Sequence, residues 1–68
     1  MTIAAQVKQT LASLKGIEAT LESFKLLESS NQTNDILDLN IQRIQKVIRD
    51  FEDRLGVLEF EEPQYKGL

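Results

Sequence analysis

Apolar residues recur along two stretches of the chain at alternating spacings of three and four, which places them on one face of an α-helix. The first stretch covers roughly residues 2–28 and is interrupted once, at Thr10. Its apolar positions are Ile3, Val7, Leu14, Ile17, Leu21 and Phe24, and Ala4 and Leu11 widen the face on one side. The spacing predicts one amphipathic helix over these residues.

A second stretch, roughly residues 34–60, repeats the spacing without interruption. Its apolar positions are Leu37, Ile41, Ile44, Ile48, Phe51, Leu55 and Leu58, and Val47 broadens the face. Such a regular seam is typical of a helix that packs closely along another helix, as in a coiled coil. We therefore predict a second helix of similar length.

The polar run at residues 29–33 separates the two stretches and predicts a loop. Serine, threonine and asparagine side chains compete for backbone hydrogen bonds and favour turns and helix N-caps. Asn31, Thr33 and Asn34 are each candidates for the cap of the second helix. Because the loop is short, the two helices should lie antiparallel, as a helical hairpin of residues 1–60.

Pro63 marks the expected end of the second helix, since proline disfavours a helical conformation at the preceding residue and has no backbone N–H. The helix should end by about residue 60 and leave residues 61–68 as a C-terminal tail. In one interpretation Phe60 and Tyr65 fold back against the end of the helices. In the other, Pro63 and Tyr65 belong to an extended segment that contacts another protein.

Gly16 and Gly56 interrupt the helical pattern, because glycine costs about 1 kcal/mol relative to alanine inside a helix. The apolar periodicity keeps its phase across Gly16. We therefore favour the interpretation in which both glycines lie away from the apolar face and the helices stay continuous. The alternative is a kink or a close backbone approach at Gly16.

The apolar faces are wider than the strip that two helices bury between them. Further apolar side chains extend them at Leu26, Leu27, Ile36, Leu39 and Val47. A single hairpin would expose this surface, whereas two hairpins related by a two-fold axis would bury it. We therefore predict an all-α fold in which the antiparallel hairpin pairs into a homodimeric four-helix bundle. The expected oligomer interface consists of Ile17, Leu21, Phe24, Ile44, Ile48, Phe51 and Leu55.

Charge limits the partners of such a bundle. The 68 residues include eight Lys and Arg against eleven Asp and Glu, for a net charge of -3. Neither nucleic acid nor an anionic membrane surface is an expected partner, because binding to both relies on basic residues. No apolar stretch is long enough to span a bilayer, and the N-terminus lacks the layout of a secretory signal. We therefore expect a cytoplasmic protein.

The residue types that carry most catalytic chemistry are missing from the sequence. It has no Cys and no His, which excludes the usual zinc ligands and the common proton-transfer side chain. The serines have no histidine to activate them, and no glycine-rich phosphate loop is present. Glu18 and Glu22 should be solvated beside the apolar face and form weak pairs with Lys15 and Lys25. We expect no catalytic, metal or cofactor site and no enzymatic activity.

The opening stretch QVKQTLASLKG at residues 6–16 and the closing stretch EEPQYKG at residues 61–67 carry a resemblance to a known family. They resemble the DUF1657 family of small proteins from endospore-forming bacteria, with similarity over essentially the whole chain. The resemblance implies a sporulation context, and the forespore or spore as a more specific location within the cell. It implies no reaction and supplies no catalytic residues.

From these observations we expect a non-enzymatic structural or protein-interaction module associated with sporulation. Its expected partners are a second copy of the chain and another spore protein. The alternative is a peripheral membrane-surface adaptor that opens its hairpin and lays both amphipathic helices on a lipid surface.

Overall fold

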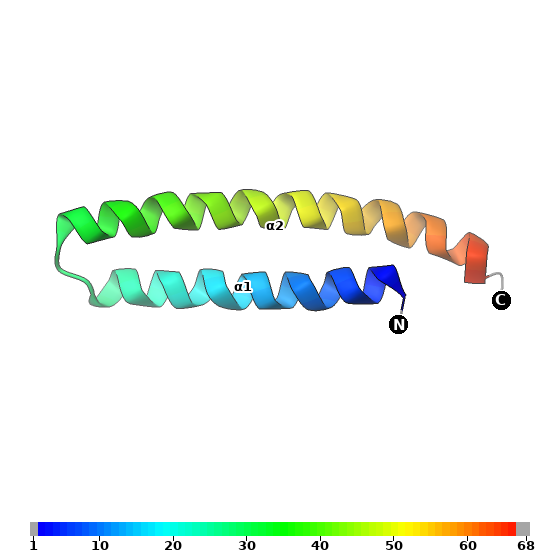
Figure 1. The fold of residues 1–68 in the computed structure, drawn as a ribbon, viewed down its shortest axis with the longest axis horizontal. Helices are drawn as coiled ribbons and strands as arrows, with labels where there is room; N and C mark the ends of the chain where they lie inside the picture. Colours follow the sequence, from blue (N-terminus) through cyan, green and yellow to red (C-terminus); the bar gives the residue numbers. More distant parts are fainter. Residues whose placement is uncertain (1, 67–68) are drawn as a thin grey trace.

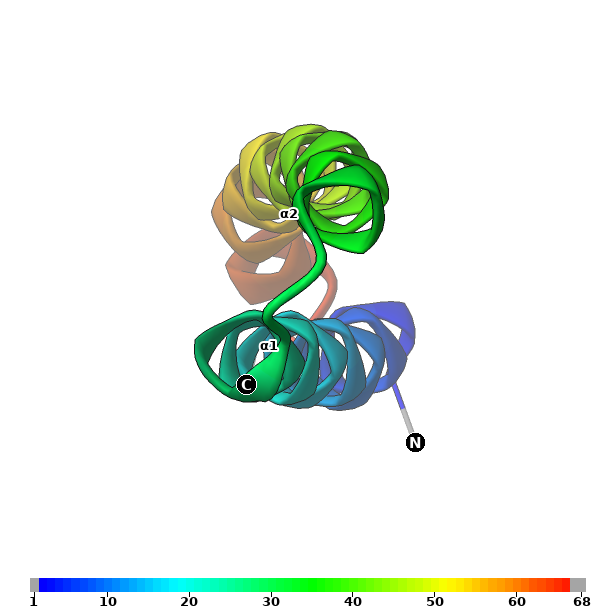
Figure 2. The same ribbon diagram turned by 90° about the vertical axis from the view of Figure 1, so that its left-hand side faces the viewer.

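A computed structural model describes the backbone of residues 2–66 and the side chains of residues 2–61. It contains helix α1, Ile3–Leu27, and helix α2, Asn31–Lys66. The helices lie side by side and run in opposite directions, which confirms the predicted all-helical hairpin (Figures 1 and 2). The molecule measures 55 × 16 × 11 Å. Its radius of gyration is 16.1 Å, against about 11 Å for a compact domain of this length. The hairpin is therefore a rod.

The buried residues form a single strip where the two helices meet. The least exposed of the described side chains are Ala4, Leu11, Ile41 and Ile48, each below a tenth of its full exposure. Half-buried apolar residues complete the strip at Val7, Leu14, Leu21, Leu37, Ile44, Phe51, Leu55 and Leu58. In α2 this strip follows the predicted seam throughout.

In α1 the buried strip lies to one side of the predicted apolar face. Ala4 and Leu11, expected only to widen that face, are at its centre, whereas Ile3 and Ile17 are 64% and 49% exposed. The physical reason is that one neighbouring helix covers only a narrow part of an apolar face. The other flank of α1 is left uncovered.

The first helix has capping at both ends. At its start the Thr2 hydroxyl oxygen accepts a hydrogen bond from the Ala5 N–H, at 3.1 Å. At its end Glu28 caps the helix in an extended conformation. The Glu28 carboxylate then accepts hydrogen bonds from the N–H groups of Ser29 and Ser30, at 3.0 and 2.9 Å. These bonds satisfy backbone donors that a turn would otherwise leave to solvent.

The second helix begins three residues earlier than predicted, because Ser30 is its N-cap. The Ser30 hydroxyl accepts from the Thr33 N–H at 3.4 Å, and the Ser30 carbonyl accepts from the Asn34 N–H at 3.0 Å. The three candidates Asn31, Thr33 and Asn34 are all inside the helix instead. The connection therefore comprises residues 28–30 rather than 29–33.

The end of α2 also differs from the prediction, since the helix continues through Pro63 to Lys66. Proline removes one backbone hydrogen bond near the end of the helix, and α2 bends in this region (Figure 1). The neighbouring glutamates are good helix formers and sustain the helical backbone. Phe60 is 76% exposed and does not fold back. Pro63 and Tyr65 are predicted to contact another protein, and they are not among the residues whose side chains the structure describes.

Both helices pass through their glycines without interruption. A Cβ atom added at Gly16 or at Gly56 would meet no other atom within 4 Å. The interpretation of tolerated glycines in continuous helices is therefore confirmed, and neither glycine serves a close approach between the two helices.

Candidate interaction surface

One flank of the rod carries charged side chains that pair between the two helices. Three ion pairs among the described side chains cross between the helices there: Lys8 with Glu59 at 2.8 Å, Lys15 with Glu52 at 3.3 Å and Lys25 with Asp38 at 2.5 Å. We call this flank the ion-paired edge and define it by these six residues. Every lysine comes from α1 and every acid from α2.

These pairs replace the weak pairs within α1 that the spacing predicted for Lys15 and Lys25. The neighbouring helix places a carboxylate within reach of each lysine, and Glu18 is half-buried in the strip rather than solvated beside it. The paired side chains are about half exposed, so each pair adds well under about 1 kcal/mol. Their main effect is to fix which flanks of the two helices meet.

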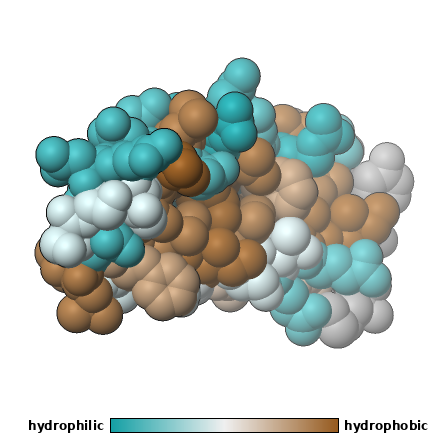
Figure 3. All heavy atoms as spheres, turned by 60° about the vertical axis from the view of Figure 1, so that its left-hand side comes forward, coloured by the Kyte–Doolittle hydropathy of each residue, from teal (hydrophilic) through white to brown (hydrophobic). Residues whose placement is uncertain are grey.

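The opposite flank is apolar and exposed. In α1, Ile3, Thr10, Ile17 and Phe24 recur every seven residues, which keeps them in one row beside the buried strip. The apolar members of this flank are 41% to 85% exposed. We call it the apolar edge and define it by Ile3, Ile17, Phe24 and Leu27 of α1 with Ile36, Val47 and Val57 of α2. Figure 3 shows hydrophobic side chains gathered across both helices on one face of the molecule.

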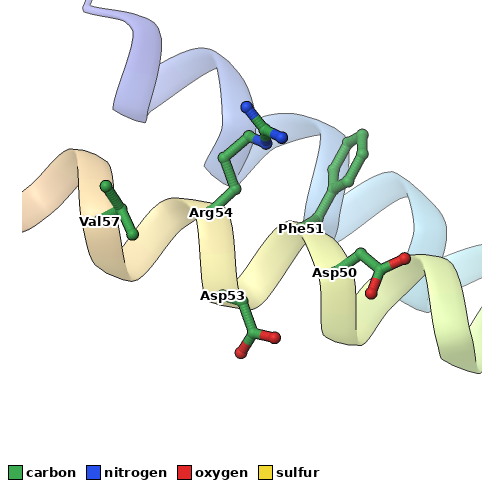
Figure 4. A pocket seen from close by; sticks show the side chains of 5 residues that line it. All are labelled: Asp50, Phe51, Asp53, Arg54 and Val57. Atoms are coloured by element: carbon green, nitrogen blue, oxygen red, sulfur yellow. The ribbon is translucent and has the colours of Figure 1, made fainter.

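An open hollow lies at each end of the apolar edge. Near the loop, a hollow of about 280 Å³ is lined by Phe24, Leu27, Glu28, Thr33 and Leu37. Near the other end, a hollow of about 580 Å³ is lined by Asp50, Phe51, Asp53, Arg54 and Val57. All five residues of the larger hollow come from α2 (Figure 4). The larger hollow is therefore a recess along one helix that is open to solvent.

The predicted interface residues divide into two groups in the structure. Ile48 is buried between α1 and α2, and the half-buried members of the same strip are Leu21, Ile44, Phe51 and Leu55. Ile17 and Phe24 lie outside that strip, on the apolar edge. Sequence reasoning missed Val57 as a member of the apolar edge. The indication in the sequence is that Val57 follows Val47 by ten residues, which is nearly three helical turns.

Hydroxyl groups along α1 are used by the helix itself. Those of Thr10, Ser13, Thr20 and Ser23 each donate to the backbone carbonyl four residues earlier, at 3.0 to 3.2 Å. Among the residues described, no group of three or more acids is gathered in a way that could hold a metal ion.

The exposed area of the rod is large for its mass. The chain exposes 5252 Å², whereas a compact monomer of 7.8 kDa exposes about 4,400 Å². The excess of roughly 850 Å² is close to the ~800 Å² that each partner buries in a standard protein interface.

The fold defines an antiparallel helical hairpin with one ion-paired edge and one exposed apolar edge. The chain belongs to the family described as protein of unknown function DUF1657, whose model matches residues 7–55. The match includes most of the opening stretch and the loop but not the closing stretch at residues 61–67, so it is shorter than the predicted resemblance. Comparison with curated proteins and with solved structures found no match. No helix in the part of the chain described here is long and apolar enough to cross a membrane.

Proposed function

We propose that this chain is a non-enzymatic protein-interaction module whose hairpins pair through their apolar edges into a homodimeric four-helix bundle. The observation that carries the proposal is the exposure of three side chains of the apolar edge. Ile17 and Phe24 of α1 are 49% and 55% exposed, and Val47 of α2 is 41% exposed. A soluble monomer rarely displays an apolar patch that extends along its whole length.

A second copy is the partner that this surface fits best. A two-fold axis makes the same edge available on both hairpins, so each apolar side chain gains a hydrophobic neighbour. The excess exposed area of the rod matches the area that a standard interface requires. Pairing also converts a single buried strip into a core shared by four helices.

The biological setting that we propose is sporulation in an endospore-forming bacterium, with a forespore or spore location. This part of the proposal is supported by the family resemblance alone. The C-terminal segment with Pro63 and Tyr65 is the proposed contact for another spore protein. The test is to replace both residues by alanine: the proposal requires an unchanged dimer that no longer captures its spore partner.

The homodimer is tested by light scattering on a sizing column over a range of protein concentrations. We expect a mass near twice 7.8 kDa, and a monomer at all concentrations would refute the proposal. Val47→Glu should give a folded monomer, because it places a charge in the apolar edge but not in the buried strip. Leu26→Glu is the matched control. Leu26 is 87% exposed and follows Lys15 by three helical turns, which places it on the ion-paired flank.

The competing function is an adaptor that lays its apolar edge on a membrane. Flotation with vesicles of neutral and anionic lipids distinguishes the two. The proposed dimer should stay in the soluble fraction with both lipids, since its apolar edge is covered and its net charge is -3. Flotation of the wild type that Val47→Glu abolishes would favour the adaptor.

A further inference from the structure

We propose that the two hairpins pair in opposite directions, about a two-fold axis that crosses the rod at the level of Ile17 and Val47. Each α2 then packs on the partner's α2, and the hollow at residues 50–57 receives the partner's Ile36, the partner's Asn40 and the partner's Arg43. This inference rests on the homodimer proposed above and specifies how its surfaces meet.

Ile17 and Val47 lie at nearly the same level of the hairpin, which makes them the natural centre of a two-fold contact. The ion pairs Lys15–Glu52 and Lys25–Asp38 enclose both residues along the two helices. A two-fold axis at this level brings Val47 against the partner's Val47 and Ile17 against the partner's Ile17. Both contacts are apolar.

The two ends of α2 are complementary around that centre. Val57 follows Val47 by ten residues and Ile36 precedes it by eleven, which corresponds to about 15 and 16 Å along a helix. Opposite directions therefore bring the partner's Ile36 onto Val57. Arg54 and Asn40 are each seven residues from Val47, so they meet as well. The Asn40 amide nitrogen donates to the Ile36 carbonyl at 2.9 Å, and its amide oxygen can accept from Arg54.

The charges on this face are complementary too. Asp50 follows Val47 by three residues and Arg43 precedes it by four. The two-fold axis therefore brings the partner's Arg43 to Asp50, and Arg43 to the partner's Asp50. In the described part of the hairpin, Arg43, Asp50 and Arg54 belong to none of the three ion pairs. In Figure 4 the side chains of Arg54 and Phe51 project on the α1 side of α2, while Asp53 points away. The larger hollow therefore presents apolar, cationic and acidic groups that the other end of α2 matches.

The alternative dimer has its two-fold axis parallel to the long axis of the rod, and it places α2 on the partner's α1. The exposed positions on that flank of α1 are all uncharged: Ile3, Gln6, Thr10, Ser13, Ile17, Thr20, Phe24 and Leu27. The partner would then offer no opposite charge to Arg43, Asp50 or Arg54, and Arg43 would be covered without a carboxylate from either helix it meets, which is unfavourable. Packing α1 on its own copy instead keeps this uncharged flank together.

Disulfide formation tests the arrangement directly, because the sequence has no Cys of its own. Three samples are oxidised: Val47→Cys alone, Ile17→Cys alone, and an equimolar mixture of Ile36→Cys with Val57→Cys, one of which carries a mass tag. We expect Val47→Cys and Ile17→Cys each to form covalent dimers, and the mixture to form only the mixed dimer. Leu26→Cys is the control, and it should form no covalent dimer.

The outcomes separate this inference from the homodimer itself. A protein that light scattering finds monomeric refutes both. A dimer in which none of the three samples forms a disulfide refutes the arrangement and leaves the homodimer standing. A disulfide between Ile17→Cys and Val47→Cys, mixed and oxidised as a fourth sample, has the same meaning.

A charge exchange gives a second readout that does not depend on cysteine. Arg43→Asp should raise the dissociation constant of the dimer roughly tenfold, because two like-charge contacts replace two attractive ones. Asp50→Arg should have a similar effect. The double variant restores both pairs and should return the dissociation constant to within about threefold of the wild type. Additive weakening in the double variant would overturn the contact.

Discussion

The Asn34 amide nitrogen donates a hydrogen bond to the Glu28 carbonyl at 3.2 Å and so ties the start of α2 to the end of α1. The amide oxygen of Asn34 is buried and has no hydrogen-bond partner in the structure. The Asn34 side chain therefore uses only its donor group, and that hydrogen bond closes a connection of three residues.

Replacing Asn34 with Ala should lower the free energy of unfolding by about 1–2 kcal/mol, because the Glu28 carbonyl loses its partner. Asn31→Ala is the control, since Asn31 is exposed at the first position of α2 and should change stability by under about 0.5 kcal/mol. Urea unfolding at one protein concentration measures both. Equal effects of the two changes would show that the Asn34 bond does not hold the turn.

A pair of leucines tests where the core of α1 lies. Leu11 is 6% exposed and Leu26 is 87% exposed. Leu11→Ala should cost about 2–4 kcal/mol through lost burial and a cavity, whereas Leu26→Ala should cost less than about 0.5 kcal/mol. Thermal unfolding followed by circular dichroism separates these expectations. A small effect at Leu11 would mean that the helices meet along the row of Ile3, Ile17 and Phe24 instead.

The ion-paired edge should contribute more to specificity than to stability. Lys15→Glu would place a carboxylate against Glu52 and should destabilise the hairpin by about 1 kcal/mol or less. The same holds for Glu52→Lys, and the double variant should recover most of the loss. Urea unfolding in low salt and in 1 M NaCl checks this, because screening should reduce the single-variant effects. Salt-independent effects would mean that the charges do not interact across the helices.

Gly16→Ala should stabilise the protein by about 1 kcal/mol, since alanine is the better helix former and its Cβ would meet no atom within 4 Å. Gly56→Ala should behave similarly for the same reason. Thermal unfolding measures the gain, and light scattering shows whether the dimer persists. A weaker dimer in Gly16→Ala alone would indicate that a partner approaches the backbone at that residue.

The sequence pattern predicted the hairpin because apolar spacing reports directly on helix faces. In α2 a single row of apolar residues is regular along the helix, and the structure buries that row. In α1 two rows share Val7, Leu14 and Leu21, so spacing alone could not decide between a row with Leu11 and a row with Ile17. The decision comes from α2, whose acids lie opposite Lys8 and Lys15.

The helix ends were harder to predict than the faces. Ser30 was one of several adjacent residues able to cap, and its use as the cap depends on the Glu28 carboxylate that also holds the turn. Proline usually ends a helix, but Pro63 lies near the end of α2, where it removes only one backbone hydrogen bond. The larger hollow was not predictable, because Asp50 and Arg54 appear in the sequence as ordinary solvated charges.

The segregation of charge between the helices has a consequence for chains that meet while they fold. Because α1 supplies every lysine and α2 every acid of the ion-paired edge, two copies of α1 or two copies of α2 would repel each other along that edge. The same rule permits α1 of one chain to pair with α2 of another, since the exchanged contacts would be identical. Charge therefore prevents like helices from pairing through the ion-paired edge, but it does not prevent domain exchange. Protection against exchange must come from the three-residue turn, where the bond between Asn34 and Glu28 favours the closed hairpin.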